Sequence, residues 1–125
     1  MKFLVVDDSP TMRRVMVNAL VKIGYTEMVE AEDGMDALMK LKNDRSIEFI
    51  ITDWNMPVLD GLTFVKTIRQ NNDYTNIPIL MVTTRGNQTD VIEALKAKVN
   101  NYVVKPFTPE ILKSKIDAVL KVLKS

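Results

Sequence analysis

The sequence contains no cysteine and no histidine among its 125 residues. The lack of cysteine excludes disulfides, thiolate metal sites and cysteine nucleophiles. The lack of histidine excludes a Ser-His or Cys-His catalytic pair and any histidine switch near neutral pH. Any chemistry carried out by this chain must therefore use oxygen ligands, carboxylates, hydroxyls and lysine.

An excess of charge of either sign is also missing, and so is any long apolar run. The 17 basic and 16 acidic residues leave a net charge of +1, which argues against nucleic-acid binding through a basic surface. The first apolar run, residues 3–6, is too short for a signal peptide, and no run approaches the length of a membrane span. We expect a cytoplasmic monomer with no nucleic-acid partner and no membrane insertion.

Short apolar runs alternate with longer amphipathic stretches along the chain. The runs that read as strands are 3–6, 28–31, 49–52, 79–82 and 102–104. Helical spacing of apolar residues follows each run, with a helix start at Ser9, a helix around 35–41, and Leu112, Ile116 and Leu123 facing inward at the end. Five strands alternating with five helices predict an α/β fold, a doubly wound parallel sheet forming one domain over residues 1–125.

Polar side chains stand directly after four of the predicted strands. Asp7 and Asp8 follow the first strand, Asp53 the third, Thr83 the fourth and Lys105 the fifth. Each of them alone has an ordinary explanation as a turn, strand-end or surface residue. Because ligands bind outside the carboxyl ends of parallel strands, their conjunction at one edge favours a functional site.

Three crowded carboxylates repel one another, and a divalent cation resolves that conflict. An all-oxygen donor set favours a hard ion, and Mg²⁺ in particular. Asp53 is the best candidate nucleophile for a phosphorus centre, because it stands alone at the middle of the sheet. Asp7 and Asp8 are adjacent, so we expect only one of them to point squarely into the site.

These residues resemble the receiver domain of two-component response regulators. The resemblance is carried by residues 5–9, 52–57, Gly61, Thr83 and 105–107. Further segments are closer still to single-domain chemotaxis regulators of the CheY type, namely 12–14, 30–34, 53–57 and 102–108. The resemblance covers essentially the whole chain and implies the flavodoxin-like strand order 2-1-3-4-5, of which CheY is itself a standard example.

The resemblance implies that Asp53 accepts a phosphoryl group from a chemotaxis histidine kinase. It also implies Mg²⁺ bound by Asp8 and Asp53, with Asp7 assisting and the backbone carbonyl of Asn55 as a further ligand. Such a protein is a phosphoacceptor that catalyses its own phosphotransfer and dephosphorylation, rather than an enzyme acting on a separate substrate.

The same resemblance assigns a catalytic role to Lys105, both a catalytic and a switch role to Thr83, and a switch role to Tyr102. Lys105 would contact the phosphoryl oxygens, Thr83 would swing its hydroxyl to the phosphoryl group, and Tyr102 would turn inward as space opens. The altered face, made of the fourth helix, fifth strand and fifth helix, would then bind the flagellar motor switch protein and control rotation. A phosphatase is a further candidate partner, and Trp54 reads as a partly exposed structural aromatic.

Two positions depart from the family pattern. Lys98 stands where a glycine is common after the fourth helix. A lysine in the left-handed conformation that suits glycine costs about 1 kcal/mol, so we expect that either the helix ends differently or Asn100 or Asn101 supplies the turn. Arg85 stands where an acidic residue is common. It would lie beside both the phosphorylation site and the output face, where it would affect partner choice or dephosphorylation.

Other functions remain alternatives at this point. A generic receiver, stand-alone or a fragment of a longer regulator, would act in another phosphorelay or in transcriptional control, although no helix-turn-helix segment precedes Ser125. A phosphohydrolase with an aspartyl intermediate commonly has the pattern Asp-x-Asp, and Asn55 removes the second acid here. A flavodoxin-like electron carrier is disfavoured because the carboxylates in 7–11 would repel a cofactor phosphate.

Overall fold

A computed structural model describes residues 1–123 of the chain, and in it five strands alternate with five helices. The strands are β1 (Lys2–Val6), β2 (Glu27–Ala31), β3 (Phe49–Thr52), β4 (Ile79–Thr83) and β5 (Asn101–Val104). The helices are α1 (Pro10–Ile23), α2 (Gly34–Asn43), α3 (Gly61–Gln70), α4 (Gln88–Lys96) and α5 (Pro109–Leu123). No helix within residues 1–123 is long and apolar enough to cross a membrane.

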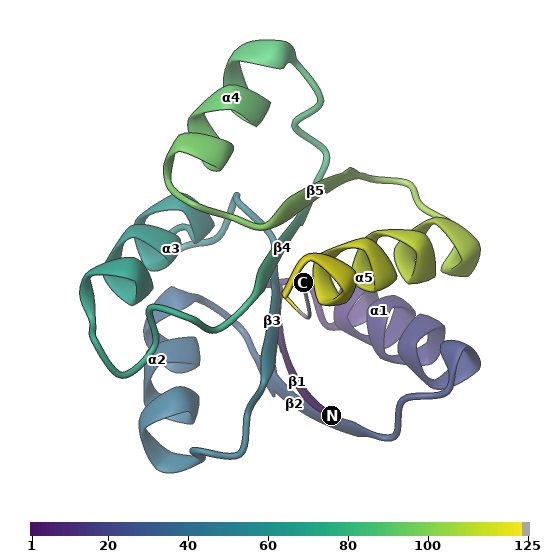
Figure 1. The fold of residues 1–125 in the computed structure, drawn as a ribbon, viewed down its shortest axis with the longest axis horizontal. Helices are drawn as coiled ribbons and strands as arrows, with labels where there is room; N and C mark the ends of the chain where they lie inside the picture. Colours follow the sequence, from purple (N-terminus) through teal and green to yellow (C-terminus); the bar gives the residue numbers. More distant parts are fainter. Residues whose placement is uncertain (124–125) are drawn as a thin grey trace.

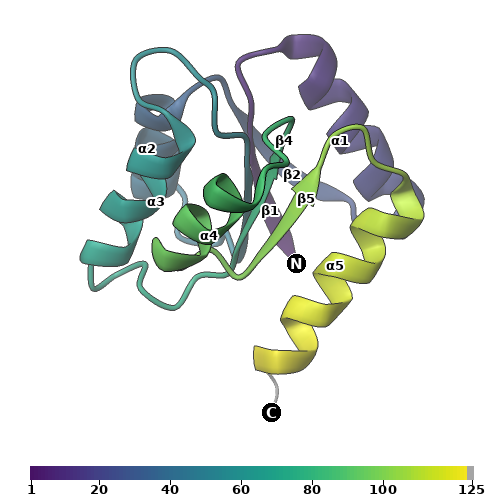
Figure 2. The same ribbon diagram turned by 90° about the horizontal axis from the view of Figure 1, so that it is seen from above.

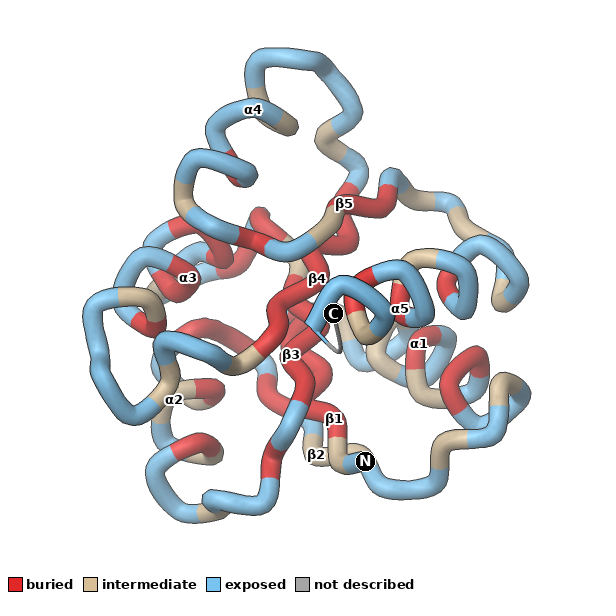
Figure 3. Tube along the Cα trace, in the orientation of Figure 1, coloured by how far each residue is buried: buried red, intermediate tan, exposed pale blue. Residues whose placement is uncertain are grey.

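The five strands form one parallel sheet in the order β2-β1-β3-β4-β5. Helices α1 and α5 cover one face of the sheet, and α2, α3 and α4 cover the other (Figures 1 and 2). The central strands are consequently buried on both faces (Figure 3), which explains why their sequences are continuously apolar rather than alternating. The predicted fold class and strand order are confirmed.

Local capping signals set where the helices begin. The hydroxyl of Ser9 accepts a hydrogen bond from the backbone N–H of Met12 at 3.2 Å, so the predicted start of α1 is confirmed. Helix α2 begins one residue before and ends two residues after the predicted range 35–41. The carboxylate of Asp33 caps it by accepting from the N–H of Asp36 at 2.8 Å, a signal that apolar spacing alone does not carry.

The last helix buries only part of its apolar stripe. Leu112 and Ile116 are fully buried, as predicted, whereas Leu123 is 50 % exposed and the prediction for it is wrong. Figure 2 shows the reason: the final turn of α5 runs past the sheet, so no layer is left there for the side chain to pack against.

The chain after α4 turns at Lys98, whose φ is +77°. The N–H of Lys98 donates to the carbonyl of Leu95 at 3.0 Å, and the N–H of Val99 donates to the carbonyl of Ala94 at 3.3 Å. This pair of bonds is the Schellman ending that usually has glycine at the left-handed position. Both expectations for this turn are therefore wrong: α4 has the usual Schellman ending, and Lys98 itself, rather than Asn100 or Asn101, adopts the left-handed conformation.

Candidate functional site

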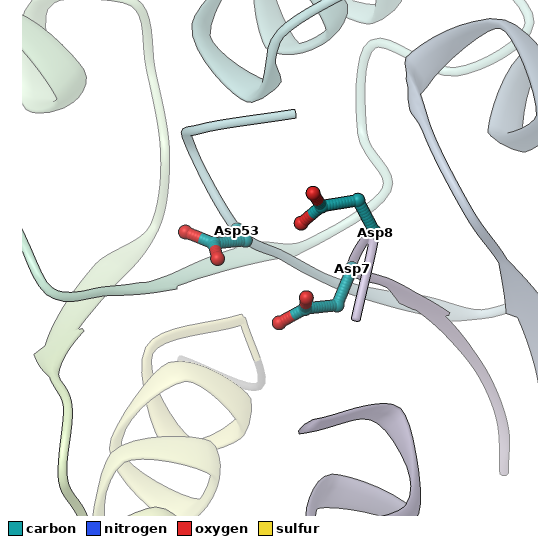
Figure 4. A group of neighbouring side chains, drawn as sticks. All are labelled: Asp7, Asp8 and Asp53. Atoms are coloured by element: carbon teal, nitrogen blue, oxygen red, sulfur yellow. The ribbon is translucent and has the colours of Figure 1, made fainter. Parts of the chain in front are cut away.

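Three aspartates lie together at the carboxyl edge of the sheet. Asp7 and Asp8 follow β1, Asp53 follows the neighbouring β3, and one carboxylate oxygen of each lies within 4.8 Å of the others (Figure 4). The predicted convergence is confirmed, but the expectation that only one of Asp7 and Asp8 points into the site is wrong. The strand ends at Val6, and the N–H of Ser9 turns back to the Asp7 carboxylate at 2.9 Å, so adjacent side chains no longer alternate.

Lys105 brings a positive charge to this group. Its ammonium lies 2.8 Å from Asp7 Oδ2 and 2.9 Å from Asp53 Oδ2, and its side chain is 10 % exposed. The backbone N–H of Lys105 donates to the carbonyl of Thr83 at 2.8 Å, which extends the β4–β5 ladder into the site. Burial by itself lowers the pKa of the Lys105 ammonium, but the hydrogen bonds and charges of Asp7 and Asp53 outweigh it and raise the pKa above its usual value. The ammonium is therefore charged at neutral pH.

The Asp53 carboxylate is held by its own main chain. The N–H of Asp53 donates to the carbonyl of Val6 at 2.9 Å, and the N–H of Trp54 donates to Asp53 Oδ1 at 2.6 Å, which leaves Oδ2 facing Lys105. Gly61 packs directly against this turn, because a Cβ there would lie 1.9 Å from the carbonyl oxygen of Asp53. Only glycine allows that approach.

The predicted switch residues border the site and meet at Arg85. Thr83 is fully buried at the end of β4, and its hydroxyl accepts from the N–H of Arg85 at 3.4 Å. Tyr102 is 8 % exposed, and its hydroxyl donates to the carbonyl of Arg85 at 2.6 Å, so its ring faces inward. Burial, with a smaller contribution from the charge of Asp90, raises the pKa of Tyr102 to about 12.

Arg85 lies beside the acidic group, as expected, but its side-chain contacts and the burial of Trp54 had no clear sequence signal. Trp54 is buried, contrary to the expectation of partial exposure, and the Arg85 guanidinium lies over its ring at 4.6 Å from the ring centroid. The Arg85 side chain also bonds to the side chain of Asn55. Together with Asp8 and Asp60, these residues line an open hollow of about 420 Å³ beside the three aspartates.

Residues 3–117 match the family model of the response regulator receiver domain. The "Chemotaxis protein CheY1" of Helicobacter pylori strain J99 is 53 % identical over 120 residues, which are 96 % of this chain and 97 % of that protein. The "Chemotaxis protein CheY homolog" of Campylobacter jejuni strain 81-176 is 52 % identical over 120 residues, covering 96 % of this chain and 92 % of that protein.

Solved structures agree with the sequence relatives. The chemotaxis protein CheY4 of Vibrio cholerae superposes with a TM-score of 0.86 at 39 % identity, over 94 % of this chain and 97 % of that chain. A putative response regulator from Chloroflexus aurantiacus superposes with a TM-score of 0.89 at 32 % identity, over 96 % and 97 %. Since the family match spans nearly the whole chain, and the acidic group stands at the sheet edge where this fold binds its ligands, the protein belongs to the response regulator receiver family and, within it, to the chemotaxis regulators of the CheY type.

Proposed function

We propose that Asp53 accepts a phosphoryl group from a chemotaxis histidine kinase in a Mg²⁺-dependent reaction. The observation that carries this proposal is the position of the Asp53 carboxylate, which shares the Lys105 ammonium with Asp7 in a group of three carboxylates. A carboxylate with a cation already beside it is suited to receive a group whose oxygens are themselves negative.

The donor set fits Mg²⁺. The three carboxylates carry three negative charges, of which Lys105 balances one and a divalent cation would balance the other two. All donors are oxygens, which suits a hard divalent ion that keeps several waters. Asp8 and Asp53 would hold the ion, with Asp7 and the backbone carbonyl of Asn55 completing the site. When bound, the ion supplies neutralisation of the charge on the transferring phosphoryl group.

The chain's own residues account for the transfer. A carboxylate oxygen of Asp53 attacks the phosphorus, an O–P bond forms, and the P–N bond of the donor phosphohistidine breaks with its electron pair going to the imidazole. Asp53 thereby loses its charge, so the Lys105 ammonium is free to contact the new phosphoryl oxygens. Attack of water on the phosphorus later restores the carboxylate, so the protein also catalyses its own dephosphorylation.

The signal leaves through the surface of α4, β5 and α5, which we call the output face. Six large apolar side chains are exposed on these elements, at 43 to 72 % of their area: Ile92, Leu95, Val104, Ile111, Val122 and Leu123. Movement of the Thr83 hydroxyl to the phosphoryl group would bias this face between two states. The relatives are named as chemotaxis proteins, and the resemblance to chemotaxis regulators implies the flagellar motor switch protein as the partner of the phosphorylated state.

Mass spectrometry of the intact protein tests the acceptor. With acetyl phosphate and Mg²⁺, the wild-type chain and the Asp73→Asn control, which changes an exposed aspartate outside the acidic group, should each gain one phosphoryl group. Asp53→Asn should gain none, and an unchanged mass gain in this variant would disprove the assignment.

A second experiment tests the partner. Cytoplasmic extract of the native organism is passed over the immobilised protein with and without a beryllofluoride mimic of the phosphoryl group. Capture of the motor switch protein only with the mimic supports the chemotaxis output. Capture of a different phosphorelay or transcription component would favour the generic receiver instead.

A further inference from the structure

Arg85 joins the two loops that border the phosphorylation site. From the loop after β4, its Nε and Nη2 atoms donate to Asn55 Oδ1, in the loop after β3, at 3.0 and 2.8 Å. Its Nη1 lies 3.4 Å from the carboxylate of Asp90 in the first turn of α4, and its guanidinium lies over Trp54. The Arg85 side chain therefore connects Asn55, two residues after the proposed acceptor Asp53, to the first turn of α4.

The main chain of the same residue holds Tyr102. The phenol hydroxyl donates to the Arg85 carbonyl at 2.6 Å, and the Arg85 N–H donates to the Thr83 hydroxyl at 3.4 Å. The position of this peptide segment thus decides whether Tyr102 keeps its acceptor inside the protein. A loop segment of this kind, with an exposed glycine next to it at Gly86, is mobile unless side chains tie it down.

We propose that Arg85 is a positioning residue. By bonding to Asn55 and Asp90, its side chain fixes the loop after β4 and keeps the Tyr102 ring inward before any phosphoryl transfer. The proposal deepens the proposed function and rests on it for the role of Tyr102 as a switch. The contacts of Arg85 themselves are independent of that role.

The bond between Arg85 and Asn55 would couple Mg²⁺ binding to the position of Tyr102. Arg85 grips the side chain of Asn55, while the backbone carbonyl of the same residue is the expected ligand of Mg²⁺. If Mg²⁺ binding at Asn55 stabilises the conformation that Arg85 holds, an inward Tyr102 would strengthen Mg²⁺ binding by the same factor, because any coupling between two sites is reciprocal. The unphosphorylated protein would already populate the inward conformer, so phosphorylation would have less of the equilibrium left to shift.

Nuclear magnetic resonance of the ring of Tyr102 tests the proposal in the full chain, without Mg²⁺ or phosphodonor. Tyrosine labelled with ¹³C gives signals from three residues, and loss of one set in Tyr102→Phe assigns it. A soluble paramagnetic agent then measures how accessible the ring is. Arg85→Ala should increase the paramagnetic relaxation of the Tyr102 signals several-fold, and Arg85→Lys should fall between, because a lysine has no fork to bridge Asn55 and Asp90.

Further variants distinguish loss of the Arg85 contacts from a general loosening of the fold. Arg45→Ala removes an exposed arginine elsewhere on the molecule and should leave the Tyr102 signals unchanged. Asn55→Ala removes the acceptor of the Arg85 hydrogen bonds. Arg85→Ala and the double variant Arg85→Ala/Asn55→Ala should therefore have nearly the same effect on Tyr102. Mg²⁺ with beryllofluoride should restore the protection of Tyr102 in Arg85→Ala, which a merely loosened fold would not show.

The pKa of the Tyr102 phenol in Arg85→Ala shifts in opposite directions depending on whether the ring stays inward or leaves the interior. The Arg85 charge lowers the pKa of Tyr102, while burial, Asp90 and Asp53 raise it. If the ring stays inward in Arg85→Ala, loss of the cation raises the pKa further; if the ring leaves, the pKa falls toward its ordinary value of about 10. A raised pKa together with unchanged relaxation would overturn the proposal. The mass gain at Asp53 tests the proposed function separately, so failure of one does not imply failure of the other.

Discussion

The Lys105 ammonium lies 2.9 Å from the carboxylate of Asp53, which is the proposed acceptor. The two residues are 52 positions apart and come from the ends of different strands, β5 and β3. The same ammonium contacts Asp7, so one lysine compensates part of the charge of the acidic group. In this state Lys105 and a bound divalent cation would compete for the same carboxylates.

Lys105→Met should therefore tighten Mg²⁺ binding while weakening the metal-free fold. Removing a positive charge from beside the divalent ion should raise the affinity for Mg²⁺ roughly tenfold in a well-hydrated site. Without Mg²⁺, the free energy of unfolding should fall by roughly 2 kcal/mol, because charged hydrogen bonds are lost and the carboxylates repel. Trp54 fluorescence measures the affinity and urea denaturation the stability. Lys66→Met, at an exposed lysine of α3, is the control, and equal Mg²⁺ affinity in both variants would contradict the competition.

Gly61→Ala should damage the acceptor and not only the fold. The new Cβ would lie 1.9 Å from the carbonyl oxygen of Asp53, and the backbone cannot give way cheaply. We expect a loss of about 3 kcal/mol in stability and a marked loss of phosphorylation by acetyl phosphate.

Gly24→Ala is the matched control for that variant. Gly24 has a φ of +121° and no atom near its missing Cβ, so alanine there should cost about 1 kcal/mol through backbone strain. It should leave the phosphorylation rate intact. If both variants lost phosphorylation only in proportion to stability, the special role of Gly61 would be refuted.

Thr83→Ala should separate phosphorylation from output. The buried hydroxyl is not the acceptor, so the mass gain at Asp53 should persist, whereas the hydroxyl that would move to the phosphoryl group is lost. The increase in affinity for the captured motor switch protein on phosphorylation should therefore shrink. Thr84→Ala, at the exposed neighbour, should keep the full increase, and the same increase in both variants would argue against a switch role for Thr83.

Lys98→Gly should stabilise the protein by about 1 kcal/mol. Lys98 has a φ of +77° at the end of α4, a conformation that penalises a Cβ. Lys96→Gly, two residues earlier and still within the helix, should instead destabilise by about 1 kcal/mol. Thermal and urea unfolding of the pair gives the comparison. Opposite signs are the expected result, and destabilisation by both would show that the left-handed lysine carries no strain.

A pH prediction follows from the burial of Tyr102. Its folded pKa of about 12 lies above the ordinary value of 10, so an unfolded chain ionises there while the folded one does not. Stability should fall as the pH rises from about 10 to 12, by on the order of 2 kcal/mol. Tyr102→Phe should flatten that part of the profile, which urea denaturation at each pH would reveal. An equally steep fall in the variant would assign it to other groups.

Much of this protein was predictable from local sequence patterns. The strand order was implied only by the family resemblance, whereas local patterns predicted three other features. Continuous apolar runs marked the buried strands, Ser9 and Gly24 marked the ends of α1, and the alternation of strands and helices placed Asp53 at a sheet edge. These features depend on residues close together in the chain, where periodicity and capping have few competing outcomes.

Other features depended on segments that meet only after folding. The exposure of Leu123 follows from where the sheet ends, and the convergence of both Asp7 and Asp8 follows from a turn just beyond β1. The bonds of Arg85 reach a residue 30 positions away, and its long side chain has many conformations that no local pattern selects. The sequence by itself determined which chemical groups stand at the strand ends, whereas the tertiary structure alone decided which of them touch, because those contacts are chosen by packing between distant segments.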